Sequence, residues 1–296
     1  MVTEKTQGKR REHSGFPLQK GAGYGMLMKT ENKEEIPMAF LQVEFFSNVL
    51  KVASTVNVIL PEKSMGIGVT AGGGEEKLPK VLYLLHGYSD DHSIWMRRTS
   101  VERYAAEYPL AVVMPAVNHS FYCNEAEGER YWDYVSEELP QVMHRFFRLS
   151  DRPEDTYAAG LSMGGYGALK LGLTHPDRFA AVGSFSGAVD VADTARLKSD
   201  MRREKERVFG DLDKLAGSDL DLFHLLKKNG AEAKKPRLYV SCGTADFLYG
   251  AHQKFVPAAE QAGWDVTHYE KPGATHEWGF WDEQIRYFIP WMLEDR

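Results

Sequence analysis

Short apolar runs alternate with helical patterns along most of this chain, and this alternation constrains the fold more than any other feature. Strands that alternate with helices are typical of βαβ units, which build a mostly parallel sheet with helices on its faces. The predicted strands are Val81–Leu85, Leu110–Met114, Thr156–Leu161, Ala180–Phe185, Leu238–Cys242 and Val266–Tyr269. The predicted helices are Val101–Glu107, Arg130–Phe147, Gly164–Thr174, Ala251–Ala262 and Trp278–Glu294.

Two segments depart from this alternation. Ala39–Phe45 and Leu50–Leu60 are rich in Val, Leu and Phe and flank Ser47-Asn48, which predicts an antiparallel hairpin at one edge of the sheet. Residues 190–235 form a long, charged, helix-prone stretch between two predicted strands, where α/β connections are usually much shorter. We expect a helical insertion there, over the carboxyl end of the sheet; the alternative is a longer crossover helix.

The first 37 residues differ in composition from the rest. They are rich in Lys, Glu, Gly and Thr and lack sustained periodicity, which predicts a flexible N-terminal extension before one α/β domain at 38–296. Lys33-Glu34-Glu35 can be encoded by AAG-GAG-GAA, which resembles a bacterial ribosome-binding site shortly before Met38. One hypothesis is that Met38 is the natural start; the other is a genuine extension. The codons of the gene would decide between them.

Composition narrows the classes of function. A formal net charge of −6 argues against a broad nucleic-acid interface. The two cysteines, Cys123 and Cys242, indicate neither a disulfide framework nor a metal site. No apolar run is long enough to span a membrane and no signal-peptide pattern opens the chain. We therefore expect a cytoplasmic protein that acts on a small molecule without metal, nucleic acid or membrane; a homo-oligomer stays open.

The strongest chemical signal is a G-x-S-x-G pentapeptide, formed by Gly160, Ser162 and Gly164. The pentapeptide alone is weak, but here an apolar strand precedes it and a helical pattern follows. A sharp strand-to-helix turn lifts the serine hydroxyl above the sheet edge, and the flanking glycines remove Cβ clashes in that turn. Ser162 is therefore the candidate nucleophile; the alternative is a glycine-rich turn without chemistry.

A nucleophilic serine needs a base, and the α/β-hydrolase fold supplies its partners in the chain order Ser, acid, His. Asp246 follows the predicted strand Leu238–Cys242 and is the candidate orienting carboxylate, although an Asp in such a turn is also typical of a turn residue. Of the ten histidines, only His276 lies after the last strand and before the final helix. His276 is the candidate general base, whereas His268, within a strand, is expected to be structural. Asp282 is the substitute if Asp246 is not the acid.

The oxyanion hole is expected after the first parallel strand, where His86-Gly87-Tyr88 follows Val81–Leu85. In this fold a backbone N–H from that loop acts together with the N–H that follows the nucleophile. The donors would be Tyr88 and Met163. Without Ser162, His86-Gly87 would indicate only a strand-ending turn.

Together these residues resemble the esterase D-like group of α/β-hydrolases, and within it the bacterial tributyrin esterase family. The resemblance covers about residues 38–296. It is carried by Leu84-Leu85-His86-Gly87, Trp95-Met96-Arg97-Arg98-Thr99-Ser100-Val101-Glu102-Arg103, Ser136-Glu137-Glu138-Leu139-Pro140 and Gly160-Leu161-Ser162-Met163-Gly164-Gly165-Tyr166-Gly167-Ala168. The resemblance implies a serine carboxylesterase for short acyl chains that works through an acyl-enzyme and needs no cofactor.

Several alternatives share parts of this pattern. S-formylglutathione hydrolases have a similar nucleophile turn, and feruloyl and acetyl-xylan esterases share the wider fold. Acyl transfer to an acceptor other than water would use the same triad, and a non-catalytic binding module of this fold is the non-enzymatic alternative. Candidate substrate-binding residues are Gly87, Trp95, Phe121 and Tyr122, although these aromatic side chains would equally suit the core or the rim.

Overall fold

The computed structural model describes residues 35–62, 77–193 and 202–294. The predicted N-terminal extension, residues 1–37, lies outside the described residues apart from 35–37, and so do the codon-based start hypothesis at 33–35 and its test.

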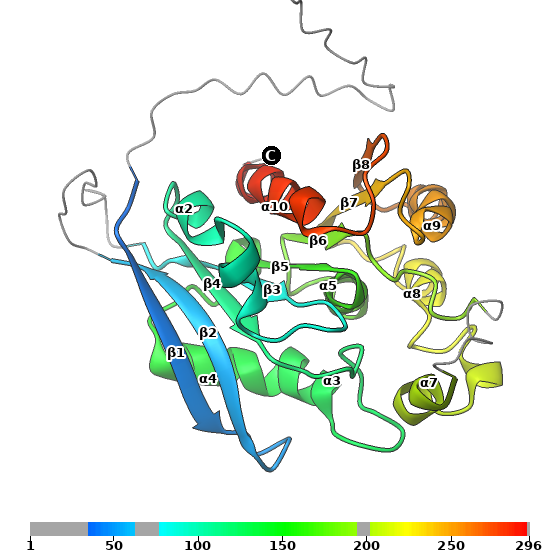
Figure 1. Cartoon of the computed structure of the whole chain (residues 1–296), viewed down its shortest axis with the longest axis horizontal. Coiled ribbons are helices and arrows are strands. Elements are labelled where there is room, and N and C mark those ends of the chain that lie inside the picture. The colour runs from blue at the N-terminus through cyan, green and yellow to red at the C-terminus, as the bar shows by residue number, and fades with distance from the viewer. Residues whose placement is uncertain (1–34, 63–76, 194–201, 295–296) are drawn as a thin grey trace, which may run out of the picture. The chain divides into compact units, whose positions relative to one another are not determined.

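A single eight-stranded sheet runs through the described residues in the order β1-β2-β4-β3-β5-β6-β7-β8 (Figure 1). Strands β1 and β2 are antiparallel to each other, β2 is antiparallel to β4, and the remaining neighbours are parallel. The strands are β1 Met38–Phe46, β2 Ala53–Pro61, β3 Lys80–Leu85, β4 Leu110–Pro115, β5 Thr156–Leu161, β6 Ala181–Phe185, β7 Arg237–Gly243 and β8 Val266–Lys271. The predicted hairpin and all six predicted parallel strands are confirmed.

Helices cover both faces of this sheet. The helices are α1 Ile94–Arg98, α2 Val101–Ala105, α3 Tyr131–Asp133, α4 Leu139–Phe146, α5 Met163–Thr174, α7 Arg202–Phe209, α8 Leu222–Lys228, α9 Tyr249–Gln261 and α10 Trp278–Leu293. A π-helical turn at Tyr134–Glu138 joins α3 to α4, so the helix predicted at 130–147 forms as three connected pieces. Helices α2 and α10 lie side by side over one face (Figure 1).

Side-chain alternation in the strands gives the sheet two cores. Along β3, Val81, Tyr83 and Leu85 pack in the core beneath α4, α5, α8 and α9. Leu82 and Leu84 pack in the other core, beneath α1, α2 and α10. A strand buried on both faces reads as a continuous apolar run, and β3 is buried from Val81 to Leu85. This rigid double-sided layer fixes where the loops at the carboxyl ends of the strands stand.

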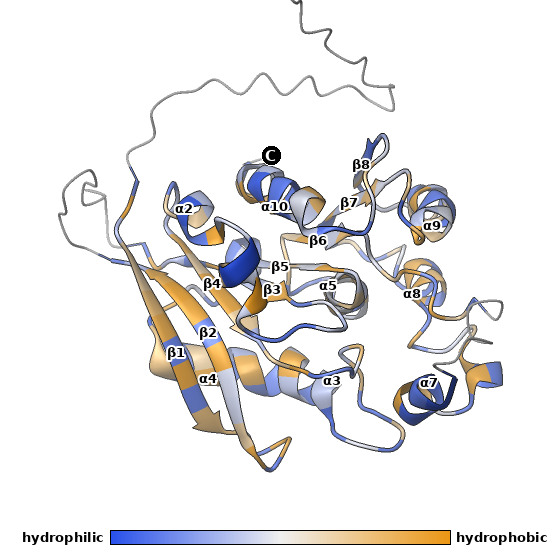
Figure 2. Ribbon diagram, in the orientation of Figure 1, coloured by the Kyte–Doolittle hydropathy of each residue, from blue (hydrophilic) through white to orange (hydrophobic). Residues whose placement is uncertain are grey.

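The segment between β6 and β7 is helical where it is described, as the sequence predicts. It holds α7, a 3₁₀ turn at Leu212–Lys214 and α8, with no strand among its described residues, 190–193 and 202–235. Residues 194–201 lie outside the described part. Helix α7 is strongly charged (Figure 2), but it buries Val208 and Phe209 at its carboxyl end.

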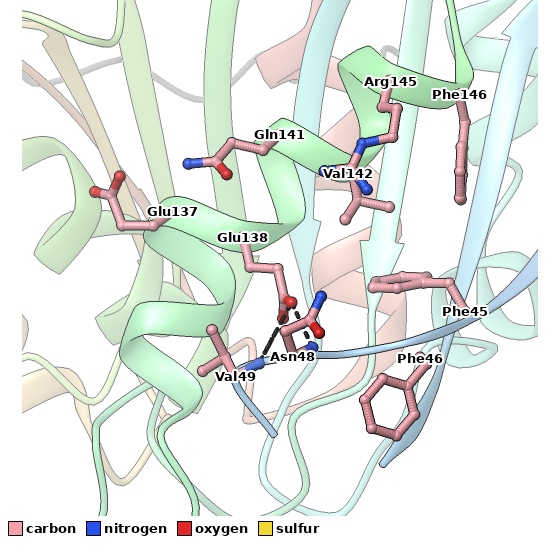
Figure 3. A pocket seen from close by; sticks show the side chains of 10 residues that line it. All are labelled: Phe45, Phe46, Asn48, Val49, Glu137, Glu138, Gln141, Val142, Arg145 and Phe146. Carbon is pink, nitrogen blue, oxygen red and sulfur yellow. Dashed lines mark hydrogen bonds between the residues drawn. The ribbon is translucent and has the colours of Figure 1, made fainter. Parts of the chain in front are cut away.

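The turn between β1 and β2 is held by Glu138 of the π-helical turn. Its carboxylate accepts hydrogen bonds from the Ser47 hydroxyl and from the backbone N–H of Asn48 at 2.6 Å and Val49 at 3.3 Å. Figure 3 shows the bonds from Glu138 to Asn48 and Val49. They lie beside a hollow of about 420 Å³ between the hairpin and α4. Its lining side chains come from residues 45–49 and 137–146, which include none of the candidate catalytic residues.

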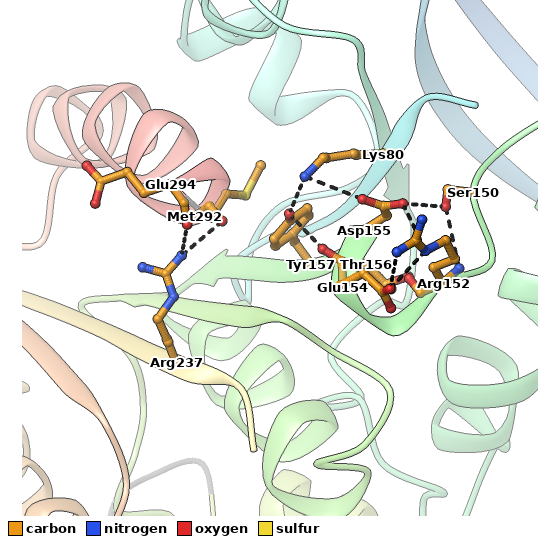
Figure 4. A network of polar contacts seen from close by, with 10 residues as sticks. All are labelled: Lys80, Ser150, Arg152, Glu154, Asp155, Thr156, Tyr157, Arg237, Met292 and Glu294. Atoms are coloured by element: carbon orange, nitrogen blue, oxygen red, sulfur yellow. Dashed lines mark hydrogen bonds and ion pairs between the residues drawn. The ribbon is translucent and has the colours of Figure 1, made fainter. Parts of the chain in front are cut away.

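The amino ends of the parallel strands carry structural polar contacts (Figure 4). At the start of β3, Lys80 lies 3.3 Å from an Asp155 carboxylate oxygen. At the start of β7, Arg237 donates to the carbonyls of Trp291 at 3.0 Å, Met292 at 3.1 Å and Glu294 at 3.3 Å. A cation at a helix carboxyl end satisfies orphan carbonyls and opposes the helix dipole. These contacts tie α10 to the sheet.

Replacing Arg237 by methionine should therefore lower the free energy of unfolding by about 1–3 kcal/mol, because the α10 carbonyls lose a charged donor. Urea unfolding followed by circular dichroism measures this change. The matched control is Arg286→Met, at an exposed position on the same helix, which should change stability by less than about 0.5 kcal/mol. Equal losses of stability in the two variants would show that the contacts between Arg237 and the α10 carbonyls do not stabilise the fold.

Candidate active site

Ser162 occupies a strained turn between β5 and α5. Its φ is 52° and its ψ is −115°, a conformation that non-glycine residues rarely adopt. The backbone around it over-determines this geometry, because Ser162 N–H donates to the Phe185 carbonyl at 2.9 Å and Ala188 N–H donates to the Ser162 carbonyl at 3.0 Å. Strain that persists in this way is typical of a functional site.

The flanking glycines are required by close packing. A Cβ added at Gly160 would stand 2.5 Å from the backbone of Gly164, and one added at Gly164 would stand 2.4 Å from the Leu85 carbonyl oxygen. Any larger residue would push α5 away from β5 and β3. The glycines that were predicted to relieve the turn therefore also allow the start of α5 to pack closely against the end of β3.

Asp246 and His276 meet at the same edge of the sheet. Asp246 follows β7 and His276 follows β8, and the His276 Nδ1 lies 2.8 Å from Asp246 Oδ2. The Asp246 side chain has no exposed surface, and its other oxygen accepts the Leu248 N–H at 2.8 Å. Since β5, β7 and β8 run parallel, their carboxyl ends share this edge with Ser162. The bond commits Nδ1 to the carboxylate and leaves Nε2 for a second partner.

Hydrogen bonds keep Asp246 ionised despite its burial. Burial raises the pKa of its carboxyl. The hydrogen bonds from His276 and from the Leu248 N–H lower it by more, so the pKa lies below its ordinary value. An ionised, buried carboxylate can hold one imidazole tautomer and stabilise the imidazolium that forms when the base takes a proton.

Two aromatic side chains that sequence reasoning missed enclose the His276 ring. The Phe247 ring centroid lies 4.6 Å away, and the edge-on Trp281 ring lies 4.8 Å away. Phe247 is 67% exposed, so it forms part of the rim. Its position next to Asp246 was the one available signal, and nothing in the sequence marked Trp281.

Asp282, the substitute acid, is occupied elsewhere. Its carboxylate accepts the Ser100 N–H at 3.0 Å and the Tyr104 hydroxyl at 3.1 Å, which joins α10 to α2. Asp246 is therefore the carboxylate that the structure brings to His276.

The two predicted oxyanion donors follow β5 and β3, respectively. Met163 is the first residue of α5, where helical N–H groups have no intrahelical partner. Tyr88 follows β3 and Gly87, and a Cβ at Gly87 would stand 2.5 Å from the side chain of Leu161, the residue before Ser162. The Tyr88 ring stacks on His119 at 4.2 Å.

The predicted pocket aromatics divide into buried and partly exposed residues. Trp95 and Tyr122 have 0% exposure, so both occupy the core, which was the alternative to binding substrate. The Trp95 indole donates to the Leu85 carbonyl at 3.1 Å, and the Tyr122 hydroxyl donates to the His86 carbonyl at 2.9 Å, so both support the loop after β3. Phe121 is partly buried and packs against Tyr88 at 5.8 Å, which leaves it the best placed of the three to line a pocket.

Helix α7 of the insertion docks beside the Tyr88 loop. Glu204 pairs with His119 Nδ1 at 3.0 Å. Ala126 N–H donates to the Val208 carbonyl at 3.1 Å, and Phe209 contacts Phe121 at a centroid distance of 5.2 Å. The insertion therefore closes one side of the region around the predicted oxyanion loop.

Among the described residues, no cluster of three or more His, Cys, Asp or Glu side chains is arranged to hold a metal ion. Cys123 and Cys242 are both buried and unpaired as disulfides, and burial raises the pKa of the Cys242 thiol to about 12. No helix in the described ranges has the length and apolar character that a membrane crossing requires.

Comparison with known proteins identifies the family of this chain. The family described as "Putative esterase" matches residues 47–291. An acetyl esterase from Caldicellulosiruptor saccharolyticus is 34% identical over 263 residues, covering 86% of this chain and 98% of that protein.

Two solved structures from Staphylococcus aureus are also similar. The fluorophosphonate-binding serine hydrolase FphF is 36% identical with a TM-score of 0.78, covering 88% of this chain and 100% of that one. The S-formylglutathione hydrolase FrmB is 36% identical with a TM-score of 0.76, covering 87% and 100%. With an eight-stranded, mostly parallel sheet and a strained serine turn at Ser162, this chain is an α/β-hydrolase and belongs to this esterase family.

Proposed function

We propose that this protein is a serine carboxylesterase that hydrolyses short-chain acyl esters, with Ser162 as nucleophile, His276 as general base and Asp246 as orienting acid. The observation that carries the proposal is the 2.8 Å bond between His276 and Asp246 at the sheet edge where Ser162 occupies its strained turn. Serine is a poor nucleophile until a base accepts its proton, and an oriented imidazole provides that base.

The reaction proceeds in two acyl transfers. His276 Nε2 accepts the Ser162 proton as the hydroxyl oxygen attacks the ester carbonyl carbon. The N–H groups of Tyr88 and Met163 stabilise the oxyanion, and His276 then protonates the departing alcohol. Water, deprotonated by His276, attacks the acyl-enzyme and releases the acid. Asp246 stays ionised throughout and stabilises the imidazolium.

An aromatic cluster supports the preference for short acyl chains. Tyr166 lies one helical turn after Ser162, and its ring contacts Phe121 at 6.0 Å and Phe209 at 6.4 Å. Phe121 in turn contacts Tyr88. The cluster thus borders both the nucleophile helix and the oxyanion loop, and Phe209 closes it from the insertion. Bulky rings at the wall of the acyl-binding region would leave little room for a long acyl chain.

Replacing Phe209 by alanine should raise kcat/KM for an octanoyl ester relative to an acetyl ester by about tenfold, because the wall recedes. A series of p-nitrophenyl esters of increasing chain length measures the change. The control is Phe223→Ala, which removes a ring of α8 that packs on Phe255 at 5.7 Å. Should both variants keep the wild-type chain-length profile, Phe209 does not limit the acyl chain.

Thioester hydrolysis is the second candidate, favoured by the 36% identity to the S-formylglutathione hydrolase FrmB. The same ester series is run beside S-formylglutathione and methyl ferulate. The substrate with the highest kcat/KM then distinguishes a short-chain esterase, a thioesterase and a feruloyl esterase. A fluorophosphonate probe distinguishes an enzyme from a non-catalytic binding module, since failure to label Ser162 would favour the module. Added alcohol acceptors report transfer to a group other than water.

A further inference from the structure

His86, which directly follows β3, is a buried side chain that the catalytic cycle does not use. The residue is 1% exposed. Its ring Nε2 lies 3.0 Å from the Val117 backbone nitrogen, and its Nδ1 lies 2.7 Å from the Gly87 carbonyl oxygen. A backbone N–H can only donate, so Nε2 is the bare, accepting nitrogen. Nδ1 therefore carries the proton and donates it to the Gly87 carbonyl.

The environment of the ring suits this neutral form. Burial lowers the pKa of His86 to about 4, so the imidazole is uncharged at neutral pH. A second proton on Nε2 would place two donors against each other at Val117. The ring is thus held in one tautomer by its two backbone partners.

The Gly87 carbonyl belongs to the same peptide unit as the Tyr88 N–H. That carbonyl accepts a second hydrogen bond, from the Asp90 N–H at 3.3 Å. No described peptide bond is cis, and in a trans unit the C=O and the N–H point in opposite directions. Two donors that fix the carbonyl therefore also fix the N–H, which is turned away from the His86 ring.

His86 also ties together the segments that surround the proposed oxyanion hole. Through Val117 it holds the loop after β4, and its own carbonyl accepts the Tyr122 hydroxyl at 2.9 Å. That carbonyl touches the start of α5, since a Cβ at Gly164 would stand 2.6 Å from it. His86 thus contacts both the loop that carries Tyr88 and the start of the helix that begins with Met163, and it fixes their relative position.

We propose that His86 is a positioning residue for the oxyanion hole, whose Nδ1–H sets the Gly87–Tyr88 peptide so that the Tyr88 N–H faces the reacting carbonyl. The proposal rests on the proposed esterase function. His86 does not touch the substrate and acts only through the peptide that it orients. A purely structural histidine would affect stability in the same way but would not affect the transition state selectively.

Two amide substitutions separate these roles. In His86→Asn the side-chain N–H₂ takes the approximate place of Nδ1–H and still donates to the Gly87 carbonyl. In His86→Gln the side-chain oxygen takes the approximate place of Nε2 and still accepts from Val117, but the Gly87 carbonyl loses its side-chain donor and keeps only the 3.3 Å bond from the Asp90 N–H. Both variants lose one buried hydrogen bond, so we expect similar losses of Tm.

The kinetic results should differ. With p-nitrophenyl acetate, His86→Gln should lower kcat by about a hundredfold with KM changed less than about threefold, whereas His86→Asn should stay within about tenfold of wild type. Inhibition by a trifluoromethyl ketone, which mimics the oxyanion, should weaken in parallel with kcat. His268→Gln on the exposed side of β8 is the control and should match wild type.

Equal loss of kcat in the Asn and Gln variants, or loss of Tm alone, would overturn the proposal. A wild-type protein that hydrolyses none of the esters would instead contradict the proposed function. If neither variant folds, ¹⁵N NMR of labelled histidines in the protein with His252→Gln still tests the tautomer, since His86 and His252 are the two buried histidines among the described residues. A buried imidazole in the Nδ1–H form supports the proposal, and an Nε2–H or doubly protonated ring at neutral pH overturns it.

Discussion

Replacing Ser162 by alanine should lower kcat for p-nitrophenyl acetate by at least about a thousandfold, with little loss of fold, because the acyl-enzyme can no longer form. The strained backbone at 162 is held by bonds from its neighbours rather than by the hydroxyl, so the variant should unfold at nearly the wild-type temperature. Stopped-flow release of p-nitrophenol and labelling by a fluorophosphonate probe measure the loss.

The matched substitutions are His276→Ala and His268→Ala. The first removes the proposed base and should cost at least about a thousandfold in kcat; the second removes an exposed imidazole on β8 and should cost nothing. A Ser218→Ala variant, altered in the insertion, should label like wild type. Ser162→Ala protein that still turns over and still binds the probe covalently would place the nucleophile elsewhere.

The second large effect is expected for Asp246→Asn, which should lower kcat by about a hundredfold to ten-thousandfold. The Asn amide would present an N–H to His276 Nδ1 and favour the tautomer whose Nε2 carries the proton. That tautomer cannot accept the proton of Ser162. Steady-state kinetics over pH 5–9 measures the loss. Wild-type activity in Asp246→Asn would show that another carboxylate is the acid.

The same variant should alter how stability depends on pH. The folded-state pKa of Asp246 is lowered, so its ionised form stabilises the fold above the unfolded value, near about 4, and this contribution is lost as pH falls through the folded value. Wild type should therefore lose stability faster than Asp246→Asn as the pH falls below about 4. Urea unfolding at a series of pH values measures the difference, and Asp282→Asn, in a contact between α2 and α10, is the comparison.

Local patterns in the sequence were sufficient for the strand order along the chain and for the three candidate catalytic side chains. Apolar runs bounded by turns fixed the strands because a strand buried on both faces must be continuously apolar. Gly160 and Gly164 marked the turn around Ser162, because a Cβ at either glycine would stand about 2.5 Å from neighbouring backbone atoms. Helix ends were less exact, since the stretch 130–147 winds into a π-helical turn that periodicity does not reveal.

Tertiary structure alone decided which late carboxylate reaches His276 and which aromatic rings surround the site. Asp246 and Asp282 are both late carboxylates in the sequence, but only folding shows that Asp282 bonds to α2. In the sequence, Trp95 and Tyr122 suited a pocket or the core equally, and only folding places both in the core. Phe247 and Trp281 flank the imidazole. The physical reason is that periodicity records which face of an element a residue occupies. It does not record which distant element packs against that face, because this depends on how the whole sheet and its helices fit together.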